Sequence, residues 1–562
     1  MLRARSSIVL AAACLLAARL GFAADAAAPP TKESRVDALF VEADRSDTPG
    51  CALGIFQDGR IAYAKGYGMA NLELGVANTP HTVYDIGSLG KQFTAFSIYL
   101  LARDGKLSID DDVRKYVPEL PDFGKPVTIR HLLHHTGGLR DYIELLELEG
   151  HGSEDLTTAR EALDTLTRQK APLFAPGERY EYSNTGYFLL SWVVKRASGK
   201  SLRDFAQERI FGPLGMTHTQ YNDDHGRIIA NRSTGYNPTD GGGFSIDMSD
   251  FEQNGDGGVN TSIEDLFLWN RNFDDPVVGD KRIVAQMEET GVLNNGKPID
   301  YASGQRVGSY RGLRTVGHTG SWAGYRALLY RFPEQKFSVA CLCNHSGIDR
   351  MQRMRQIADI YLADRMTKPA EAAAKTPIAI SPADLERLAG AYRDPKTGEV
   401  WFFSVVNGGL VASTGGSRIR LDAVAPDLFV PRSGGSLQVR FDKPASAASG
   451  RSGFTASWPE DDATQRFEPI ATWTPTAKDL AALAGSYTSD EVPAIFRFFV
   501  ADGGLWIRHR EFEDAPWRPT VKDSFTLDGA NVTFSKDGSG RATGFRLDVE
   551  GMRGIVFRRI GS

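Results

Sequence analysis

The stretch Asp85-Ile86-Gly87-Ser88-Leu89-Gly90-Lys91-Gln92-Phe93-Thr94 decides how the rest of the chain is interpreted. Apolar residues recur after it at helical spacing, which predicts a helix over 92–103 that begins close to Ser88. Lys91 then lies three residues after Ser88, on the same face of the helix. A desolvated lysine with a lowered pKa can accept the proton of a serine hydroxyl, so this pair is typical of a nucleophile and its base.

Ser-x-x-Lys is a weak signal on its own, because such matches arise by chance, but two later motifs support it. Tyr182-Ser183-Asn184 supplies a Tyr-x-Asn motif, and His318-Thr319-Gly320-Ser321 follows further along. Each has a structural alternative, with Tyr182 as a core tyrosine and His318 as a loop histidine. Their order, at separations of 94 and 136 residues, favours one shared catalytic site.

Two predicted β-hairpins lie outside these three motifs. Residues 50–67 have the pattern of two strands joined at Asp58-Gly59, and residues 325–343 hold two apolar runs split by Pro333-Glu334-Gln335. The residues between the hairpins are mostly helical in pattern. Hairpins at both ends of a helical middle predict one sheet that is built from segments far apart in the chain.

A histidine-rich segment, Thr128-Ile129-Arg130-His131-Leu132-Leu133-His134-His135, raises the question of a metal site. It lacks the H-E-x-x-H spacing and any accompanying carboxylate pattern. A short helix that begins after a Thr128 cap accounts for it instead. We therefore expect no metal and no other cofactor.

Length and composition set broad limits on the protein. A chain of 562 residues predicts two to four domains. Its 41% hydrophobic and 24% charged residues are ordinary for a globular protein. The net charge is −5, the pI is near 6.1, and no basic patch contains interleaved aromatic residues, which argues against nucleic acid as a partner. The sequence leaves the oligomeric state open.

The N-terminus has the pattern of a signal peptide over residues 1–23. Arg3 and Arg5 precede an apolar run from Ile8 to Ala18, and Gly21-Phe22-Ala23 resembles a cleavage site. The run is too short to span a bilayer, so we expect no transmembrane span after cleavage. The mature protein is expected in the bacterial periplasm or outside the cell.

Three cysteines, Cys51, Cys341 and Cys343, remain after such a cleavage. Cys341 and Cys343 stand two apart in an apolar run and therefore face the same side of a predicted strand. Buried reduced thiols are the favoured interpretation. The alternative is a disulfide from Cys51 to one of the other two.

The character of the sequence changes near residue 366. Residues 366–380 are rich in Ala, Pro and Lys and have the composition of a linker, and short strand-like runs follow. Leu388-Ala389-Gly390-Ala391-Tyr392 recurs as Leu483-Ala484-Gly485-Ser486-Tyr487, and Gly408-Gly409-Leu410 recurs as Gly503-Gly504-Leu505, each 95 residues later. Each copy holds about eight such runs, enough for a small closed barrel, so we predict two eight-stranded antiparallel barrels over 381–471 and 477–562.

Residues 32–365 resemble the superfamily of serine β-lactamases and penicillin-binding proteins, on the side of class C β-lactamases and esterases. The three motifs carry this resemblance, together with the phrases at 128–133, 176–184 and 257–261. The resemblance implies a five-stranded antiparallel sheet and an α-helical subdomain, with the site between them. Two barrels behind such a domain resemble the layout of the bacterial D-aminopeptidases.

Carried over to this sequence, the resemblance implies that Ser88 forms an acyl-enzyme. Lys91 and Tyr182 would share the proton transfers, with Tyr182 the favoured base if Lys91 stabilises its phenolate. Asn184 would hydrogen-bond both Lys91 and the substrate. The backbone N–H groups of Ser88 and Ser321 would form the oxyanion hole.

The substrate would also face His318 and Gly320, and His318 departs from the pattern of true β-lactamases and DD-carboxypeptidases. Those enzymes have a lysine there, which offers a positive charge to the carboxylate of the substrate. A largely neutral imidazole is a poorer partner for a carboxylate. The departure disfavours a primary β-lactamase or carboxypeptidase role and suits a substrate with a free amine or with no charge at that position.

The sequence thus predicts an exported serine hydrolase that resembles D-aminopeptidases and acts on short peptides, amides or other small molecules. A carboxylesterase of the same family is the first alternative, and a penicillin-binding or β-lactamase-type protein, or a non-catalytic binding protein, is the second. An α/β-hydrolase is disfavoured because no serine lies in Gly-x-Ser-x-Gly. For a substrate with a free amine, two acidic barrel loops are the candidates to supply negative charge, at 511–514 and 537–540.

Overall fold

The computed structural model describes residues 30–562, apart from 153, 240, 368–376, 415–416, 433–436, 443–450, 459–462, 511–513, 550 and 562. The predicted signal peptide and most of the predicted linker lie outside the described residues. Within the described part, no helix is both long and apolar enough to cross a membrane.

The domain that precedes the predicted linker is built on an antiparallel sheet with strand order β10-β11-β12-β13-β1-β2. Both predicted hairpins are confirmed, and the first turns at Asp58 and Gly59, which both have positive φ. The pairing of β1 with β13 joins the two hairpins across the domain. The strands are β1 (Cys51–Gln57), β2 (Arg60–Tyr67), β10 (Arg306–Tyr310), β11 (Leu313–Trp322), β12 (Tyr325–Phe332) and β13 (Phe337–Cys343).

This sheet has six strands, one more than the five that the sequence led us to expect. The additional edge strand, β10, precedes a tight turn at Arg311 and Gly312, both with positive φ. None of its five residues is buried, so its sequence lacks the apolar alternation of a half-buried strand. The antiparallel class of the sheet is as predicted.

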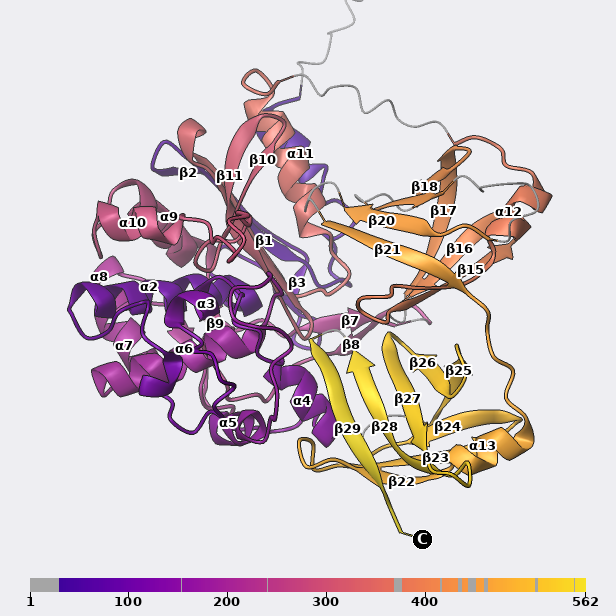
Figure 1. Cartoon of the computed structure of the whole chain (residues 1–562). Helices are drawn as coiled ribbons and strands as arrows, with labels where there is room; N and C mark the ends of the chain where they lie inside the picture. Colours follow the sequence, from indigo (N-terminus) through magenta and orange to yellow (C-terminus); the bar gives the residue numbers. More distant parts are fainter. Residues whose placement is uncertain are drawn as a thin grey trace, which may run out of the picture.

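Helices cover both faces of the sheet (Figure 1). Residues of β13 alternate between two apolar clusters: Val339 and Cys341 pack with α1 (Lys32–Asp37) and α11 (Arg350–Leu362), and Ala340 and Leu342 face the opposite cluster. That second cluster contains α9 (Ile263–Asp274) and the helical subdomain. The helices of the subdomain are α2 (Lys91–Arg103), α3 (Ile129–Leu133), α4 (Tyr142–Glu149), α5 (Ala159–Thr167), α6 (Asn184–Ser198), α7 (Leu202–Ala206), α8 (Gly212–Leu214) and α10 (Lys281–Met287).

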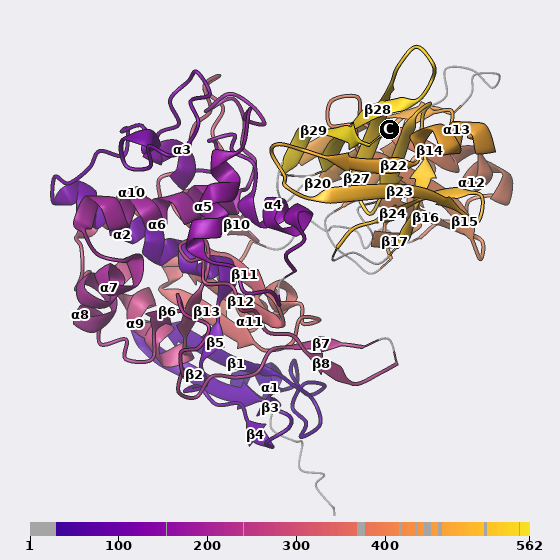
Figure 2. The ribbon, with the colours of Figure 1, turned by 90° about the horizontal axis from the view of Figure 1, so that it is seen from below.

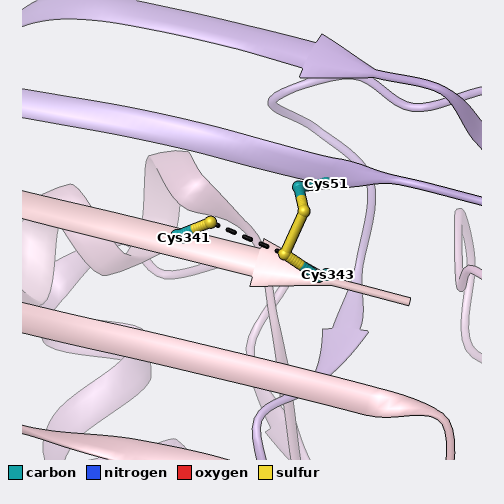
Figure 3. A group of neighbouring side chains, drawn as sticks. All are labelled: Cys51, Cys341 and Cys343. Carbon is teal, nitrogen blue, oxygen red and sulfur yellow. Dashed lines mark hydrogen bonds between the residues drawn. A yellow bond between two sulfur atoms is a disulfide. The ribbon is translucent and has the colours of Figure 1, made fainter. Parts of the chain in front are cut away.

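The structure corrects the favoured interpretation of the cysteines (Figure 3). Cys51 and Cys343 form a disulfide, and buried Cys341 stays reduced, with its Sγ 3.5 Å from Sγ of Cys343. Cys51 stands directly opposite Cys343 in the β1–β13 pair, with the two Cα atoms 4.0 Å apart. The sequence could not supply this register, because the two strands are almost 300 residues apart.

Replacing Cys51 by alanine should therefore destabilise the protein. The bridge joins residues separated by 292 positions, and its loss should lower the free energy of unfolding in urea by about 2–5 kcal/mol. The matched control, Cys341→Ala, keeps the bridge and should cost about 1 kcal/mol for the lost sulfur. If alkylation of the denatured, unreduced protein labels Cys51, Cys341 and Cys343 alike, the bridge does not exist.

Two closed eight-stranded antiparallel barrels follow, as predicted (orange and yellow in Figure 1). The repeated motif has the same role in both, since the hydroxyl of Tyr392 donates to the carbonyl of Leu388, and that of Tyr487 to the carbonyl of Leu483. The first barrel comprises α12 (Pro382–Leu388), β14 (Gly390–Arg393), β15 (Val400–Val406), β16 (Gly409–Thr414), β17 (Ser417–Ala425), β18 (Leu428–Pro431), β19 (Gln438–Phe441), β20 (Phe454–Trp458) and β21 (Ala463–Ile470). The second comprises α13 (Ala477–Leu483), β22 (Gly485–Thr488), β23 (Ile495–Ala501), β24 (Gly504–Arg508), β25 (Ala515–Pro519), β26 (Ser524–Leu527), β27 (Ala530–Lys536), β28 (Ala542–Val549) and β29 (Met552–Ile560).

The two barrels differ in how they join the domain that carries the six-stranded sheet. Both lie on one side of it (Figure 2). The apolar core of the first barrel is a cluster of its own. The core of the second belongs to the same continuous cluster as the helical subdomain. The second barrel and the helical subdomain therefore share one apolar core.

Candidate active site

Ser88 lies in a 3-10 turn, Gly87–Gly90, that leads directly into α2. The turn is pressed against β11, and two glycines make this approach possible. A Cβ on Gly320 would lie 1.8 Å from the carbonyl oxygen of Ile86, and Gly87 has a φ of 48° with its Cβ position 3.0 Å from the backbone of Ser321. Glycine at both positions thus lets β11 bring Ser321 beside Ser88.

Lys91 is fully buried at the base of the site. Its Nζ lies 3.0 Å from Oγ of Ser88, 2.9 Å from Oδ1 of Asn184 and 2.6 Å from the carbonyl oxygen of Asp256. Burial lowers the pKa of Lys91 to about 8, against the opposing influence of the carboxylates of Asp256 and Asp141. A large fraction of Lys91 is therefore neutral near pH 8.

The Tyr-x-Asn motif spans the start of α6: Tyr182 precedes the helix and Asn184 is its first residue. The Tyr182 ring lies under Nζ of Lys91, 4.9 Å from it, and its buried hydroxyl has no hydrogen-bond partner among the described residues. Burial raises the pKa of Tyr182 well above its usual range, although nearby Ser88 acts in the opposite direction. His135 supports the motif, because its ring packs against that of Tyr182, with the centroids 4.2 Å apart and the planes tilted by 34°, and its Nδ1 accepts the Ser183 N–H at 3.1 Å.

His318 lies behind the site rather than in it. Its Nε2 is 3.0 Å from the hydroxyl of Tyr301, and its Nδ1 hydrogen-bonds the carbonyl oxygen of Thr319. Burial lowers the pKa of His318 to about 3, so the ring is neutral at any physiological pH. Arg350, the first residue of α11, donates to Oγ of Ser321 at 2.8 Å.

A cavity of about 390 Å³ opens in front of Ser88. Four of the seven predicted site residues line it, namely Ser88, Tyr182, Asn184 and Ser321, and the other three (Lys91, His318 and Gly320) lie behind its wall. The lining is acidic, because it holds four carboxylates against the single guanidinium of Arg232. These carboxylates belong to Asp85, Glu144, Glu147 and Asp256.

A model of the family described as Beta-lactamase matches residues 36–363, more than half of the chain. The chain belongs to the Beta-lactamase family. A D-aminopeptidase from Cereibacter sphaeroides is 26% identical over 460 residues, which cover 82% of this chain and 83% of the relative. Penicillin-binding protein 4* from Bacillus subtilis is 30% identical over 358 residues, which cover 60% and 77%.

A solved structure of the octameric penicillin-binding protein homologue from Pyrococcus abyssi shares the fold. It is 26% identical, with a TM-score of 0.57, and the match covers 77% of this chain and 99% of that one. Together these comparisons support a serine hydrolase of the Beta-lactamase family and a layout like that of the D-aminopeptidases.

Sequence reasoning missed three further residues of this family site. Asp141 accepts the backbone N–H of Asn184 at 2.6 Å, and Asp256 accepts the hydroxyl of Tyr142 at 3.0 Å. His135 belonged to a segment that was explained only by its helix cap, and that capped helix is confirmed. The signals were weak, because Asp141 and Asp256 lie in loops and act through contacts with residues distant in sequence.

The acidic barrel loops that we considered for the site do not line the cavity within the described part of the chain. Residues 511–513 lie outside the described residues, and Asp514 pairs with Arg508 of its own barrel. Asp537 accepts hydrogen bonds from Ser539 in its own turn. The carboxylates at the cavity come from the catalytic domain instead.

The reactivity of Ser88 should follow the titration of Lys91. Only the neutral amine accepts a proton, so kcat/KM should rise about tenfold per pH unit below pH 8 and level off above it. A neutral ester is the substrate of choice, because it does not titrate itself. A profile that is flat from pH 6 to 9, or that turns near pH 6.5 like an ordinary histidine, would contradict the assignment of Lys91.

Proposed function

We infer that this protein is an exported serine hydrolase that forms an acyl-enzyme on Ser88 and releases amino acids from short peptides or amides with a free amine, as a D-aminopeptidase does. Residues 32–365 would form the catalytic domain, and 381–471 and 477–562 the barrels. The predicted signal peptide and the buried Cys51–Cys343 bridge support export, because disulfides persist in oxidising compartments.

The hydrogen bonds around Lys91 support its role as the base. The two oxygens that it contacts besides Ser88 are carbonyl oxygens, of Asn184 and of Asp256, and they can only accept. A neutral amine would donate its two N–H groups to them and turn its lone pair to the hydroxyl of Ser88. Burial disfavours the phenolate of Tyr182, so we assign the first proton transfer to Lys91, the reverse of the preference from the sequence.

Tyr182 is then available as an acid. Its phenol stays protonated and lines the cavity beside Ser88. The proton that Lys91 takes from Ser88 would pass to the leaving amine through the Tyr182 hydroxyl, which gives one proton, receives another and ends the step protonated, with Lys91 neutral again. The N–H groups of Ser88 and Ser321 are the proposed oxyanion hole, since β11 and the 3-10 turn lie against each other.

The acidic lining of the cavity is the main observation in favour of a substrate with a free amine. Glu144 and Glu147 project from α4, and Asp256 lies opposite, 7% exposed, with one carboxylate oxygen that has no partner among the described residues. An ammonium group in the cavity would be attracted by these carboxylates. A substrate carboxylate would meet no cation at neutral His318. A free amine therefore fits this cavity better than a β-lactam carboxylate.

A substrate panel tests the proposal. D-alanyl p-nitroanilide should be hydrolysed with a higher kcat/KM than its N-acetyl derivative, a short acyl ester or a chromogenic cephalosporin. Glu147→Gln should raise KM for the free-amine substrate about tenfold, the loss of one charge-assisted contact, and leave the N-acetyl substrate unchanged. Equal rates with free and blocked amines, or a marked preference for the ester, would favour the carboxylesterase alternative.

A further inference from the structure

Among the contacts of the second barrel with the β-lactamase-like domain, those at Arg140-Asp141, the segment immediately before α4, lie nearest to the site in sequence and in bonding. Two backbone carbonyls of the barrel accept hydrogen bonds there, one in the turn between β28 and β29 and one at the start of β29. The Asp141 N–H donates to the carbonyl of Gly551 at 3.1 Å, and the guanidinium of Arg140 donates to the carbonyl of Arg553 at 2.9 and 3.2 Å. Figure 1 shows α4 beside β29 at this junction.

A buried ion pair reinforces the junction. Nη1 of Arg140 lies 2.7 Å from a carboxylate oxygen of Glu491, and the two side chains are only 3% and 7% exposed. That oxygen also accepts the Lys170 N–H at 2.9 Å, and Gln169 bonds both to Arg140 and to the carbonyl of Glu491. A buried pair with these additional hydrogen bonds holds a fixed geometry, because loss of either partner leaves an uncompensated charge.

The same short segment holds the catalytic motif. Asp141 accepts the backbone N–H of Asn184, and the hydroxyl of Thr185 donates to the carbonyl of Arg140 at 2.7 Å. Asn184 in turn accepts from Lys91. Glu491 in the second barrel is therefore connected to the proposed base beside Ser88 through its ion pair with Arg140, the peptide bond from Arg140 to Asp141, and the hydrogen bonds from Asp141 to Asn184 and from Asn184 to Lys91.

Two more contacts act on the same region. Arg553 lies 3.3 Å from the carboxylate of Glu181, the residue just before Tyr182. His509 bonds the carbonyl of Leu148 at 3.1 Å, so the barrel holds α4 near its C-terminus as well as at its start. This helix carries Glu144 and Glu147 of the cavity wall.

We propose that the second barrel is a positioning domain for catalysis, in which Glu491 and Arg553 hold the Tyr182–Asn184 motif and α4 in their reactive arrangement. Neither residue lines the cavity, so both act through Arg140, Asp141 and Glu181 and not on the substrate. The proposal rests on Ser88 as the nucleophile, which is part of the proposed function, and it is independent of the substrate class.

Point variants of the full chain test this, since deletion of the barrel would expose its shared apolar core. Glu491→Ala removes the ion pair, Glu491→Gln keeps one acceptor oxygen, and Arg553→Ala removes the contact with Glu181 alone. The matched control is Asp490→Asn, because Asp490 is the neighbouring residue and makes ion pairs with Lys170 and Arg558 on the exposed edge of the same interface.

The readouts are the rate constant for labelling by a fluorophosphonate, which needs no knowledge of the substrate, and kcat and KM with a short acyl ester. Glu491→Ala should lower the labelling rate and kcat about 10²-fold, the effect of a small misplacement of catalytic groups, with KM little changed. Glu491→Gln should fall between it and the wild type, and Asp490→Asn should label at the wild-type rate.

Wild-type labelling by folded Glu491→Ala, with folding checked by its melting temperature, would overturn the proposal. If that variant does not fold, Arg553→Ala decides, because it keeps the buried pair: a labelling rate at least tenfold lower supports positioning, and an unchanged rate overturns it. An equal loss in Asp490→Asn would also overturn it. If instead the proposed substrate class is wrong, the wild-type protein should react rapidly with the fluorophosphonate but hydrolyse amino amides slowly.

Discussion

Lys91 has no exposed surface, and its amine is enclosed by the hydroxyl of Ser88 and two carbonyl oxygens. A buried ammonium is costly unless acceptors and negative charge surround it. Here the carboxylates of Asp141 and Asp256 keep the pKa of Lys91 from falling further than about 8. This balance between burial and nearby negative charge leaves part of the amine neutral at mildly alkaline pH, as the proposed role of Lys91 as the base requires.

The elements around Lys91 keep its amine buried and in contact with Ser88 and Asn184. The sheet brings β11 against the turn that carries Ser88, and glycine at 87 and 320 lets the two backbones approach closely. Asn184 begins α6 and is fixed through Asp141, which also caps α4. Asp141 thus connects the chemistry, the acidic cavity wall and the second barrel. A barrel that shares an apolar core with the helical subdomain is part of the same mechanical unit.

Much of this organisation could be predicted from local sequence. Hairpins follow from Asp58-Gly59 and similar turns, and the helix after Ser88 follows from apolar spacing, since both depend on neighbours in the chain. The three motifs placed Ser88, Lys91, Tyr182 and Asn184, which the structure brings together. The two barrels could be predicted because the motif at 388–392 recurs at 483–487.

What could not be predicted depends on contacts between distant segments. The Cys51–Cys343 bridge requires the register of β1 against β13, and the roles of Asp141, Asp256 and Glu491 require the docking of loops and of a whole domain. The edge strand β10 has no apolar pattern because neither of its faces is buried. Such features arise from tertiary packing, to which composition and periodicity are insensitive.

The central claim is that Ser88 is the residue acylated in this site. Reaction of the full-length protein with a fluorophosphonate, followed by peptide mass analysis, tests it most directly. The account predicts one adduct, on the peptide that contains Ser88, and none in Ser88→Ala, whose cavity is otherwise intact. An adduct on another serine that persists in Ser88→Ala would contradict it.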